Sequence, residues 1–192
     1  MNDLEAFLAD TVRRHETATT AVRNGDATAL IGMLSNHDPV TLFPASQPSK
    51  LGWAEVSEAF GRVASLYSNA TPVRFEVLAA GVSGDLAYLV GFERGSAAVG
   101  GGSPEPVNLR VTQIYRREDG EWKLVHRHGD PGPGGDTGVD HLRAAMRDRT
   151  GGDISADHAS SSGTERRDQL RRRALAEPVS TAQSSPVLWL AD

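Results

Sequence analysis

The chain has 192 residues, of which 39% are hydrophobic, and its formal net charge is −5. It contains no cysteine, which excludes disulfides, thiolate chemistry and cysteine-ligated zinc sites. The acidic balance argues against a nucleic-acid-binding surface, and no apolar run is long enough to cross a bilayer. The N-terminus is acidic and lacks the apolar segment of a signal peptide. We therefore expect a cytoplasmic protein with no nucleic-acid partner and no membrane partner.

Three amphipathic helices are expected in the first third of the chain, because apolar side chains recur there at helical spacing. The first covers residues 3–23 and is stopped by Asn24-Gly25, both of which tolerate the left-handed backbone conformation. Asp26 is the expected N-cap of a second, shorter helix. A short strand at 40–45 separates it from a third helix within 49–69.

From residue 73 onward the hydrophobic period changes to two, which is typical of strands. The connection at 96–106, "SAAVGGGSPEP", is expected to be a loop. Amphipathic helices must bury their apolar side, so the helices should cover one face of the sheet. The chain is therefore predicted to be an α+β cone, in which a strongly curved antiparallel sheet and three N-terminal helices enclose a pocket. The four meander strands are expected at 73–84, 86–95, 107–117 and 121–130.

The composition changes after Asp130, where "PGPGGDTG" breaks any strand. We place the domain at residues 1–130 and expect 131–192, which is rich in Gly, Ser and Arg, to be mostly disordered. Within this tail the pattern allows two short helices, at 139–149 and 164–176. The second is rich in arginine, and it is either a solvated segment or a partner-binding one.

Four segments resemble the SnoaL-like, ketosteroid-isomerase-like group of the nuclear-transport-factor-2-like superfamily. They are "NGDATALIGMLS", "DPVTLF", "GWAEVSEAF" and above all "LRVTQIYRREDGEWKLVHRHGD". The last also resembles the association domain of calmodulin-dependent kinase II. The resemblance covers residues 1–130, and it implies a pocketed fold that serves both enzymes and pure binding modules. It also implies a homodimer, since relatives of this fold commonly pair through the sheet.

The hairpin turn at 117–121 decides which strand residues share a face of the sheet. A three-residue loop with Gly120 in the left-handed conformation pairs Arg117 with Glu121. A two-residue Asp-Gly turn would instead shift the register by one residue. We adopt the first register, which groups one polar patch on a single face: Arg110, Thr112, His126 and His128, with Trp122 and Leu124 below it.

The opposite face is then expected to line the pocket. Aligned without gaps, the pocket arginines of the kinase association domain fall on Val90, Gln113 and Gly129. None of these is arginine, so the anionic-ligand chemistry of that relative is not implied. The predicted pocket-lining residues are Phe43, Tyr88, Val90, Phe92, Val111, Gln113, Tyr115 and Val125.

The residues that a steroid isomerase needs are missing. The same kind of alignment puts its oxyanion-donating tyrosine on Ala18 and its general-base aspartate on Phe43, neither of which can move a proton. We therefore expect a small-molecule-binding or assembly module with a small hydrophobic ligand. The alternative is an acid/base enzyme (isomerase, cyclase or hydrolase class) acting on a hydrophobic ring or polyketide-like substrate. Its candidate catalytic residues would be His15, Asp38 and Arg127.

The His-x-His sequence at 126–128 allows two interpretations. With Asp130 and Glu93 it has the donor types of a facial metal triad. Alternatively, it belongs to a structural hydrogen-bonded network, in which the fork of Arg110 pairs with Glu93. We adopt the second interpretation and expect neither metal nor cofactor. The predicted network is Glu93, Arg110, Thr112, His126 and His128.

Overall fold

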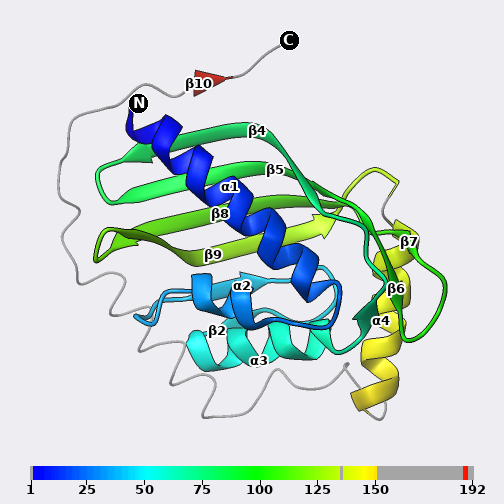
Figure 1. The fold of residues 1–192 in the computed structure, drawn as a ribbon. Helices are drawn as coiled ribbons and strands as arrows, with labels where there is room; N and C mark the ends of the chain where they lie inside the picture. Colours follow the sequence, from blue (N-terminus) through cyan, green and yellow to red (C-terminus); the bar gives the residue numbers. More distant parts are fainter. Residues whose placement is uncertain (1, 135, 151–187, 190–192) are drawn as a thin grey trace.

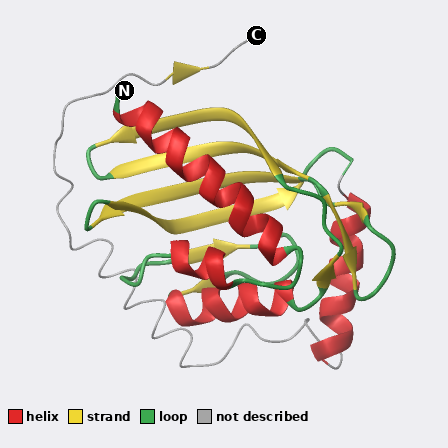
Figure 2. Ribbon diagram, viewed as in Figure 1, coloured by secondary structure: helices red, strands yellow, loops and turns green. Residues whose placement is uncertain are grey.

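The fold is a bent antiparallel sheet with helices packed against one face. A computed structural model describes residues 2–134, 136–150 and 188–189. Helix α1 (Asp3–Val22) runs diagonally across the strands, while α2 (Thr28–Met33) and α3 (Trp53–Ala64) lie along one edge of the sheet (Figures 1 and 2). The predicted α+β cone, with its N-terminal helices over one face of a curved sheet, is confirmed.

The main sheet has the order β10-β4-β5-β8-β9-β1-β2. All neighbouring strands are antiparallel except β1 and β9, which run parallel. A second, small sheet has the order β3-β6-β7. The strands of the main sheet are β1 (Thr41–Phe43), β2 (Lys50–Leu51), β4 (Arg74–Ser83), β5 (Leu86–Arg94), β8 (Leu109–Glu118), β9 (Glu121–Pro131) and β10 (Leu188–Trp189). Those of the small sheet are β3 (Tyr67–Ser68), β6 (Ser96–Val99) and β7 (Glu105–Pro106).

Side-chain hydrogen bonds lie at the start of the first two helices, although the N-cap residue of α2 is Ala27 and not the predicted Asp26. Asn2 and Glu5 form a capping box, in which the Glu5 amide donates to Asn2 Oδ1 at 2.9 Å and the Asn2 amide donates to Glu5 Oε2 at 3.0 Å. Asp26 Oδ1 accepts from the Thr28 amide at 2.8 Å. These bonds satisfy amides that have no partner within the first turn of a helix.

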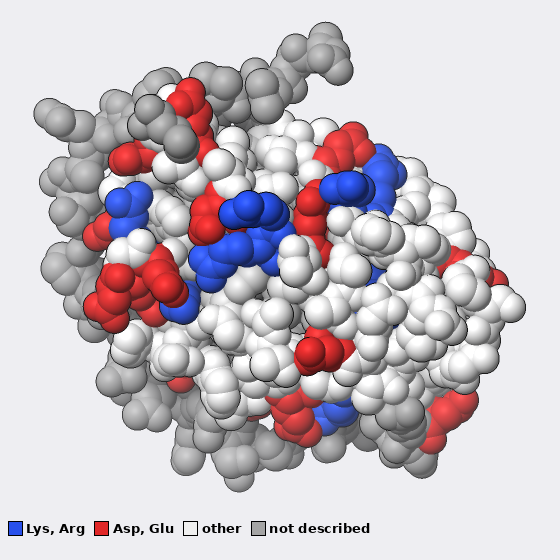
Figure 3. Space-filling model, viewed as in Figure 1, with Lys and Arg blue, Asp and Glu red and all other residues white. Residues whose placement is uncertain are grey.

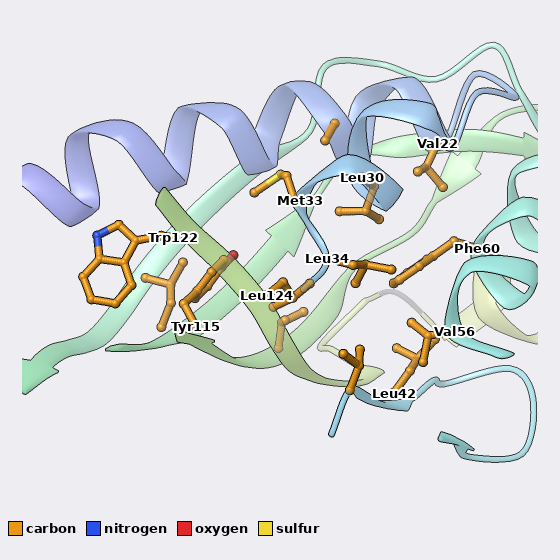
Figure 4. Packing of buried hydrophobic residues seen from close by; sticks show 14 of the residues in the cluster. Val22, Leu30, Met33, Leu34, Leu42, Val56, Phe60, Tyr115, Trp122 and Leu124 are labelled. Atoms are coloured by element: carbon orange, nitrogen blue, oxygen red, sulfur yellow. The ribbon is translucent and has the colours of Figure 1, made fainter. Parts of the chain in front are cut away.

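The core fills the space between α1 and the sheet (Figure 4). The Phe7 ring is fully buried and makes edge-to-face contacts with Tyr115 and Trp122, at centroid distances of 5.4 Å and 5.2 Å. Such pairs add to the stabilisation that apolar burial itself provides. Because α1 repeats its inward positions every three or four residues, one side of the helix is buried along its whole length. These inward residues are Phe7, Thr11, His15, Ala18, Thr19 and Val22.

The hairpin between β8 and β9 differs from the predicted three-residue loop. Glu118 pairs with Glu121, and the turn is the two-residue Asp119-Gly120, with φ of 50° and 83°. A β-bulge at Val125 then shifts the register by one further residue. The bulge restores the shared face of the predicted polar patch, but it turns Trp122 and Leu124 to the core side, contrary to the prediction.

The structured region extends beyond the predicted boundary at residue 130. Helix α4 (Asp136–Thr150) buries Val139, Leu142 and Met146. It packs against the small sheet, two of whose strands lie in the segment that we expected to be a loop at 96–106. The short helix that the sequence allows at 139–149 is confirmed by α4, but its packing on the domain was not predicted, because its partner surface is distant in sequence. The other helix predicted in the tail, at 164–176, lies outside the described residues.

Helix α4 is also tied to the loop that follows β1. The guanidinium of Arg143 donates from Nε to the carbonyl of Ala45 at 2.9 Å.

Within the part of the chain that the structure describes, none of the helices combines the length and hydropathy needed to cross a membrane.

Candidate functional site

A cavity of about 70 Å³ lies where α1, α3, the main sheet and α4 meet. Most of its wall is apolar. Three charged residues line it, Arg23 at the end of α1, Glu93 on β5 and Arg127 on β9, together with the uncharged polar residues Thr19, Ser46, Gln47 and Tyr67. Ligand sites commonly combine an apolar wall with a few polar groups in this way. The apolar wall residues are Val22, Leu30, Leu42, Pro44, Ala45, Phe60, Val63, Leu109, Val139 and Leu142.

Four side chains, His15, Arg23, Glu93 and Arg127, form a buried unit that we call the Glu93 cluster. Arg127 Nη2 donates to both carboxylate oxygens of Glu93, each at 2.9 Å. His15 Nε2 lies 2.8 Å from Glu93 Oε1, whereas Arg23 Nη2 lies 3.6 Å from Oε2. The side chains of Glu93 and His15 are 1% and 0% exposed. Glu93 therefore has three hydrogen bonds and is shielded from water.

A glycine leaves room for this arrangement. A Cβ atom at Gly129 would lie 2.8 Å from Nη1 of Arg127, so a larger residue would displace the guanidinium. Gly129 and Arg127 share the inward face of β9, and the Arg127 side chain reaches across towards β5. The absence of a side chain at residue 129 thus allows the ion pair with Glu93.

His15 is surrounded by polar partners inside the Glu93 cluster. The Tyr115 hydroxyl donates to Gln113 Oε1 at 2.8 Å, so Gln113 presents its amide nitrogen to the His15 ring, 3.2 Å from Nδ1 and 3.3 Å from Nε2. Nε2 also lies 2.8 Å from Glu93 Oε1 and 3.3 Å from Thr19 Oγ1. Arg23 and Arg127 contribute two positive charges and Glu93 one negative charge, so a positive charge remains in the Glu93 cluster.

Glu93 is held in its ionised form. Burial by itself would raise the pKa of the carboxyl group, but Arg127, the hydrogen bond from His15 and Arg23 together lower that pKa well below its usual range. A carboxylate stabilised so strongly is a poor base. Burial lowers the pKa of Arg23, an effect that Glu93 opposes, and burial raises the pKa of Tyr67, so its hydroxyl stays protonated.

Arg23 lacks the partners that Arg127 has. Its side chain is 3% exposed, yet neither Nη1 nor Nη2 makes a hydrogen bond with any described residue. Buried guanidinium groups normally make several hydrogen bonds, because a charge without partners is costly to remove from water. The Glu93 cluster is internal, whereas the surface around α1 carries charges of both signs, interspersed with uncharged areas (Figure 3).

The three candidate catalytic residues are only partly brought together. His15 and Arg127 meet through Glu93, and Arg127 also lines the cavity. Asp38 is exposed in the connection before β1 and does not line the cavity. No catalytic pairing of Asp38 with His15 or Arg127 is present in this geometry.

The predicted pocket-lining residues do not line this cavity, which requires a correction. Val111, Gln113 and Tyr115 point inward as predicted but are packed in the core, and Val125 is half-buried at the bulge. Each β5 side chain points to the face of the sheet opposite to the one we expected. The inward residues of β5 are Ala87, Leu89, Gly91 and Glu93, so Tyr88, Val90 and Phe92 lie on the outer face.

The outer face carries the His-x-His patch, without Glu93. His126 Nδ1 lies 2.7 Å from Thr41 Oγ1, and His128 Nε2 lies 3.2 Å from Asp130 Oδ2. Burial, followed by the neighbouring His128, lowers the pKa of His126. Phe43, predicted to line the pocket, instead sets its ring edge-on against both imidazoles. Among the described residues no group of three or more side chains is arranged to hold a metal ion.

The predicted pairing of Arg110 with Glu93 is also corrected. Arg110 lies opposite Asp130 and next to Phe92 on the outer face, whereas Glu93 points to the inner face. Adjacent residues on a strand point to opposite sides of a sheet, so the phase of β5 decides the partner of Glu93. Arg127 takes the place that we expected for Arg110. Thr112 lies on the outer face beside His128, in a groove that also contains Val90 and Phe92.

Residues 15–130 match the family described as the SnoaL-like domain. The chain belongs to this family. The match ends before α4, so this SnoaL-like chain closes its cavity with a helix that lies outside the matched residues. No curated protein matches the chain.

Solved structures with TM-scores above 0.5 share the fold. One is a proposed dehydratase of the nuclear-transport-factor-2-like family from Streptomyces avermitilis, with 18% identity, a TM-score of 0.53 and coverage of 67% of this chain and 98% of the other. A proposed aromatic ring hydroxylase from Novosphingobium aromaticivorans has 19% identity, a TM-score of 0.54 and coverage of 66% and 87%. A proposed calcium/calmodulin-dependent protein kinase II association domain from Xanthomonas campestris has 18% identity, a TM-score of 0.46 and coverage of 67% and 86%. At these identities the likeness is one of fold.

Two residues of the site were missed from the sequence. Arg23 follows His15 and Thr19 at intervals of four, which is the spacing of one helix face, so the α1 pattern contained a signal for it. Leu142 belongs to the mostly disordered tail that we expected, within the short helix allowed at 139–149, but no packing of that helix on the domain was predicted. Its only signal was the spacing of three between Val139 and Leu142.

Proposed function

We propose that this SnoaL-like chain binds a small organic molecule in the cavity and does not catalyse proton transfer there. The observation that carries the proposal is the cavity itself, which combines an apolar wall with the buried Glu93 cluster. Its volume of about 70 Å³ is far below the ~300–1,000 Å³ of pockets for drug-sized ligands. The cavity therefore suits a compact molecule better than a polyketide-like ring system.

The acid/base alternative has less support from the geometry. A general base needs a pKa near the working pH and a position within reach of the substrate. Glu93 reaches the cavity, but its pKa is far too low, and its oxygens are occupied by Arg127 and His15. Asp38 is exposed and does not line the cavity.

The proposal is tested by filling the cavity. Val63 lines it from α3, so Val63→Phe should occupy the space that a ligand would take. Val12, a half-buried valine on α1 that does not line the cavity, gives the matched control Val12→Phe. A library of small acids, amides, alcohols and amines is screened by thermal shift, because a ligand that binds only the folded state raises its melting temperature.

We expect at least one class to stabilise the wild type and Val12→Phe but not Val63→Phe. Native mass spectrometry of the purified protein should also show any molecule that is retained from expression. If no class stabilises the wild type, or if Val63→Phe responds as fully as Val12→Phe, the cavity is not a ligand site.

We also propose that the chain pairs through the outer face of its sheet. Several large apolar side chains are exposed there. Leu78, Leu86 and Ile114 are 43%, 53% and 37% exposed, and Phe43 on β1 is 43% exposed. An apolar surface shared by several strands is commonly covered by a partner. A second copy of this chain is the partner that we propose.

A further inference from the structure

The chemical class of the ligand follows from the hydrogen bonds that Arg23 lacks. A guanidinium has five N–H donors and no acceptor. In Arg23 neither terminal nitrogen has a hydrogen-bond partner among the described residues, although the side chain is 3% exposed. Its nearest carboxylate oxygen, Glu93 Oε2, lies 3.6 Å from Nη2. Arg23 also lines the cavity, so an acceptor placed there would meet donors that no described residue satisfies.

Glu93 does not serve as the acceptor that Arg23 lacks. Its carboxylate already takes two hydrogen bonds from Arg127 and one from His15. Two guanidinium groups, Arg23 and Arg127, face this one carboxylate, so a positive charge remains in the Glu93 cluster. A negative charge in the cavity would offset it.

A second donor lies on the same side of the cavity. Tyr67 lines it from β3 and interacts electrostatically with Arg23. Burial raises the pKa of its hydroxyl, which therefore stays protonated and can donate. Arg23 and Tyr67 thus offer guanidinium N–H groups and a hydroxyl as donors to the two oxygens of one ligand. A carboxylate accepts hydrogen bonds in this way.

The apolar side chains of the cavity wall indicate the chemical nature of the remainder of the ligand. Val22, Leu42, Phe60 and Leu142 present only carbon atoms, which favour an alkyl or aryl group over a hydrated ion. We propose that the ligand is a small organic monocarboxylate, with its carboxylate on Arg23 and Tyr67 and its apolar body against this wall. The inference rests on the proposed function, and it names residues other than Val90, Gln113 and Gly129, where the sequence alignment had located the arginines of a relative.

The experiment compares acids with neutral molecules of the same shape. Sodium butyrate and benzoate are titrated into the full-length chain by isothermal calorimetry, alongside butyramide and benzamide. Sodium chloride and inorganic phosphate, at matched ionic strength, test for simple anion binding. We expect at least one carboxylate to bind at least tenfold more tightly than its amide and than either inorganic ion.

Variants separate this inference from the proposed function. Arg23→Gln should lower carboxylate affinity at least tenfold and leave amide affinity unchanged, while Arg23→Lys should keep part of the preference for the acid. Arg94→Gln, which changes an arginine whose side chain is 41% exposed, is the matched control and should have no effect. Without ligand, Arg23→Gln should melt at a higher temperature than the wild type, because it removes a buried charge that lacks partners.

Each outcome has one interpretation. If acids and amides bind equally and Arg23→Gln changes neither, the pocket binds ligands but the carboxylate assignment is wrong. If chloride or phosphate binds as tightly as the carboxylates, the site takes inorganic anions and the assignment is also wrong. If no probe of any class binds to the wild type, and Val63→Phe gives the same result, both the carboxylate assignment and the proposed function are wrong.

Discussion

Replacing Glu93 with glutamine should be among the most destabilising single polar changes in this chain. The substitution keeps the shape and one acceptor but removes the only negative charge of the Glu93 cluster, so Arg23 and Arg127 remain buried with no carboxylate. The carboxylate accepts bonds at 2.9, 2.9 and 2.8 Å, and its side chain is 1% exposed. Removing one partner from a buried ion pair costs about 3–5 kcal/mol. At this chain length the melting temperature should fall by roughly 10 °C.

The measurement is urea unfolding followed by circular dichroism, with thermal melting as a second probe. The matched control is Glu76→Gln, because Glu76 pairs with Arg94 at 2.6 Å while both side chains are about half exposed, at 50% and 41%. That change should cost less than about 1 kcal/mol. If Glu93→Gln costs as little as Glu76→Gln, the cluster is hydrated and the reasoning on its net charge fails.

A double replacement separates the lost charge from lost packing. Glu93→Leu combined with Arg127→Met removes both charges of the tightest pair and leaves apolar side chains of similar length. Well-packed apolar replacements of buried ion pairs are often neutral or stabilising. We therefore expect the double variant to be more stable than Glu93→Gln alone, and a double variant that is less stable would contradict the charge argument.

Three further outcomes can be measured on the same protein. Because the pKa of Glu93 in the folded state lies below the ordinary value of 4.5, its contribution to stability is complete above about pH 4.5 and is lost as the pH falls, so acid unfolding should be steeper in the wild type than in Glu93→Gln. Ending the chain after residue 134 should lower the melting temperature, since three buried apolar side chains of α4 are removed, whereas ending it after residue 150, which keeps α4 and removes the two-residue strand β10, should lower it less. Sedimentation should show a particle of about twice the chain mass of 20.5 kDa, and Ile114→Lys should convert it to the single-chain mass.

Each of the three has a clear contrary result. Identical acid unfolding of the wild type and Glu93→Gln would mean that the pKa of Glu93 is the same in the folded and the unfolded state. Equal melting of the two truncated chains would show that α4 adds nothing to the fold. A single-chain particle at every concentration tested would rule out pairing through the sheet.

The helices and the meander were predictable because their signals are local. The apolar repeat of α1 and the alternation in β4, β5, β8 and β9 are present in the residues of each element. The inward phase of β5 was not predictable in this way. Its larger side chains, Tyr88 and Phe92, point outward. The inward position between them is Gly91, where a side chain has no room because Cε1 of the Phe75 ring lies 2.6 Å from where a Cβ would be. Hydrophobicity alone therefore favours the opposite phase, and with it the incorrect partner for Glu93.

Neither the turn nor the cavity could be predicted from local sequence patterns. Gly120 suits both a two-residue and a three-residue loop, and the bulge at Val125 has no residue type that marks it. The cavity is built from the end of α1, from α2 and α3, from five strands and from α4, which lie more than a hundred residues apart at the extremes. Arg23 was nevertheless within reach of the sequence, since it continues the helix face that contains His15 and Thr19.

The extra residue that β9 carries at Val125 makes this strand intolerant of changes in length. Side chains alternate along a strand, yet Leu124 and Arg127 both face inward because the bulge inserts one residue between them. Deleting a residue there would turn one of the two inward runs to the outside. Either Trp122 would leave the ring of Phe7, or Arg127 would leave Glu93. Related chains should therefore accept substitutions along β9 far more readily than insertions or deletions.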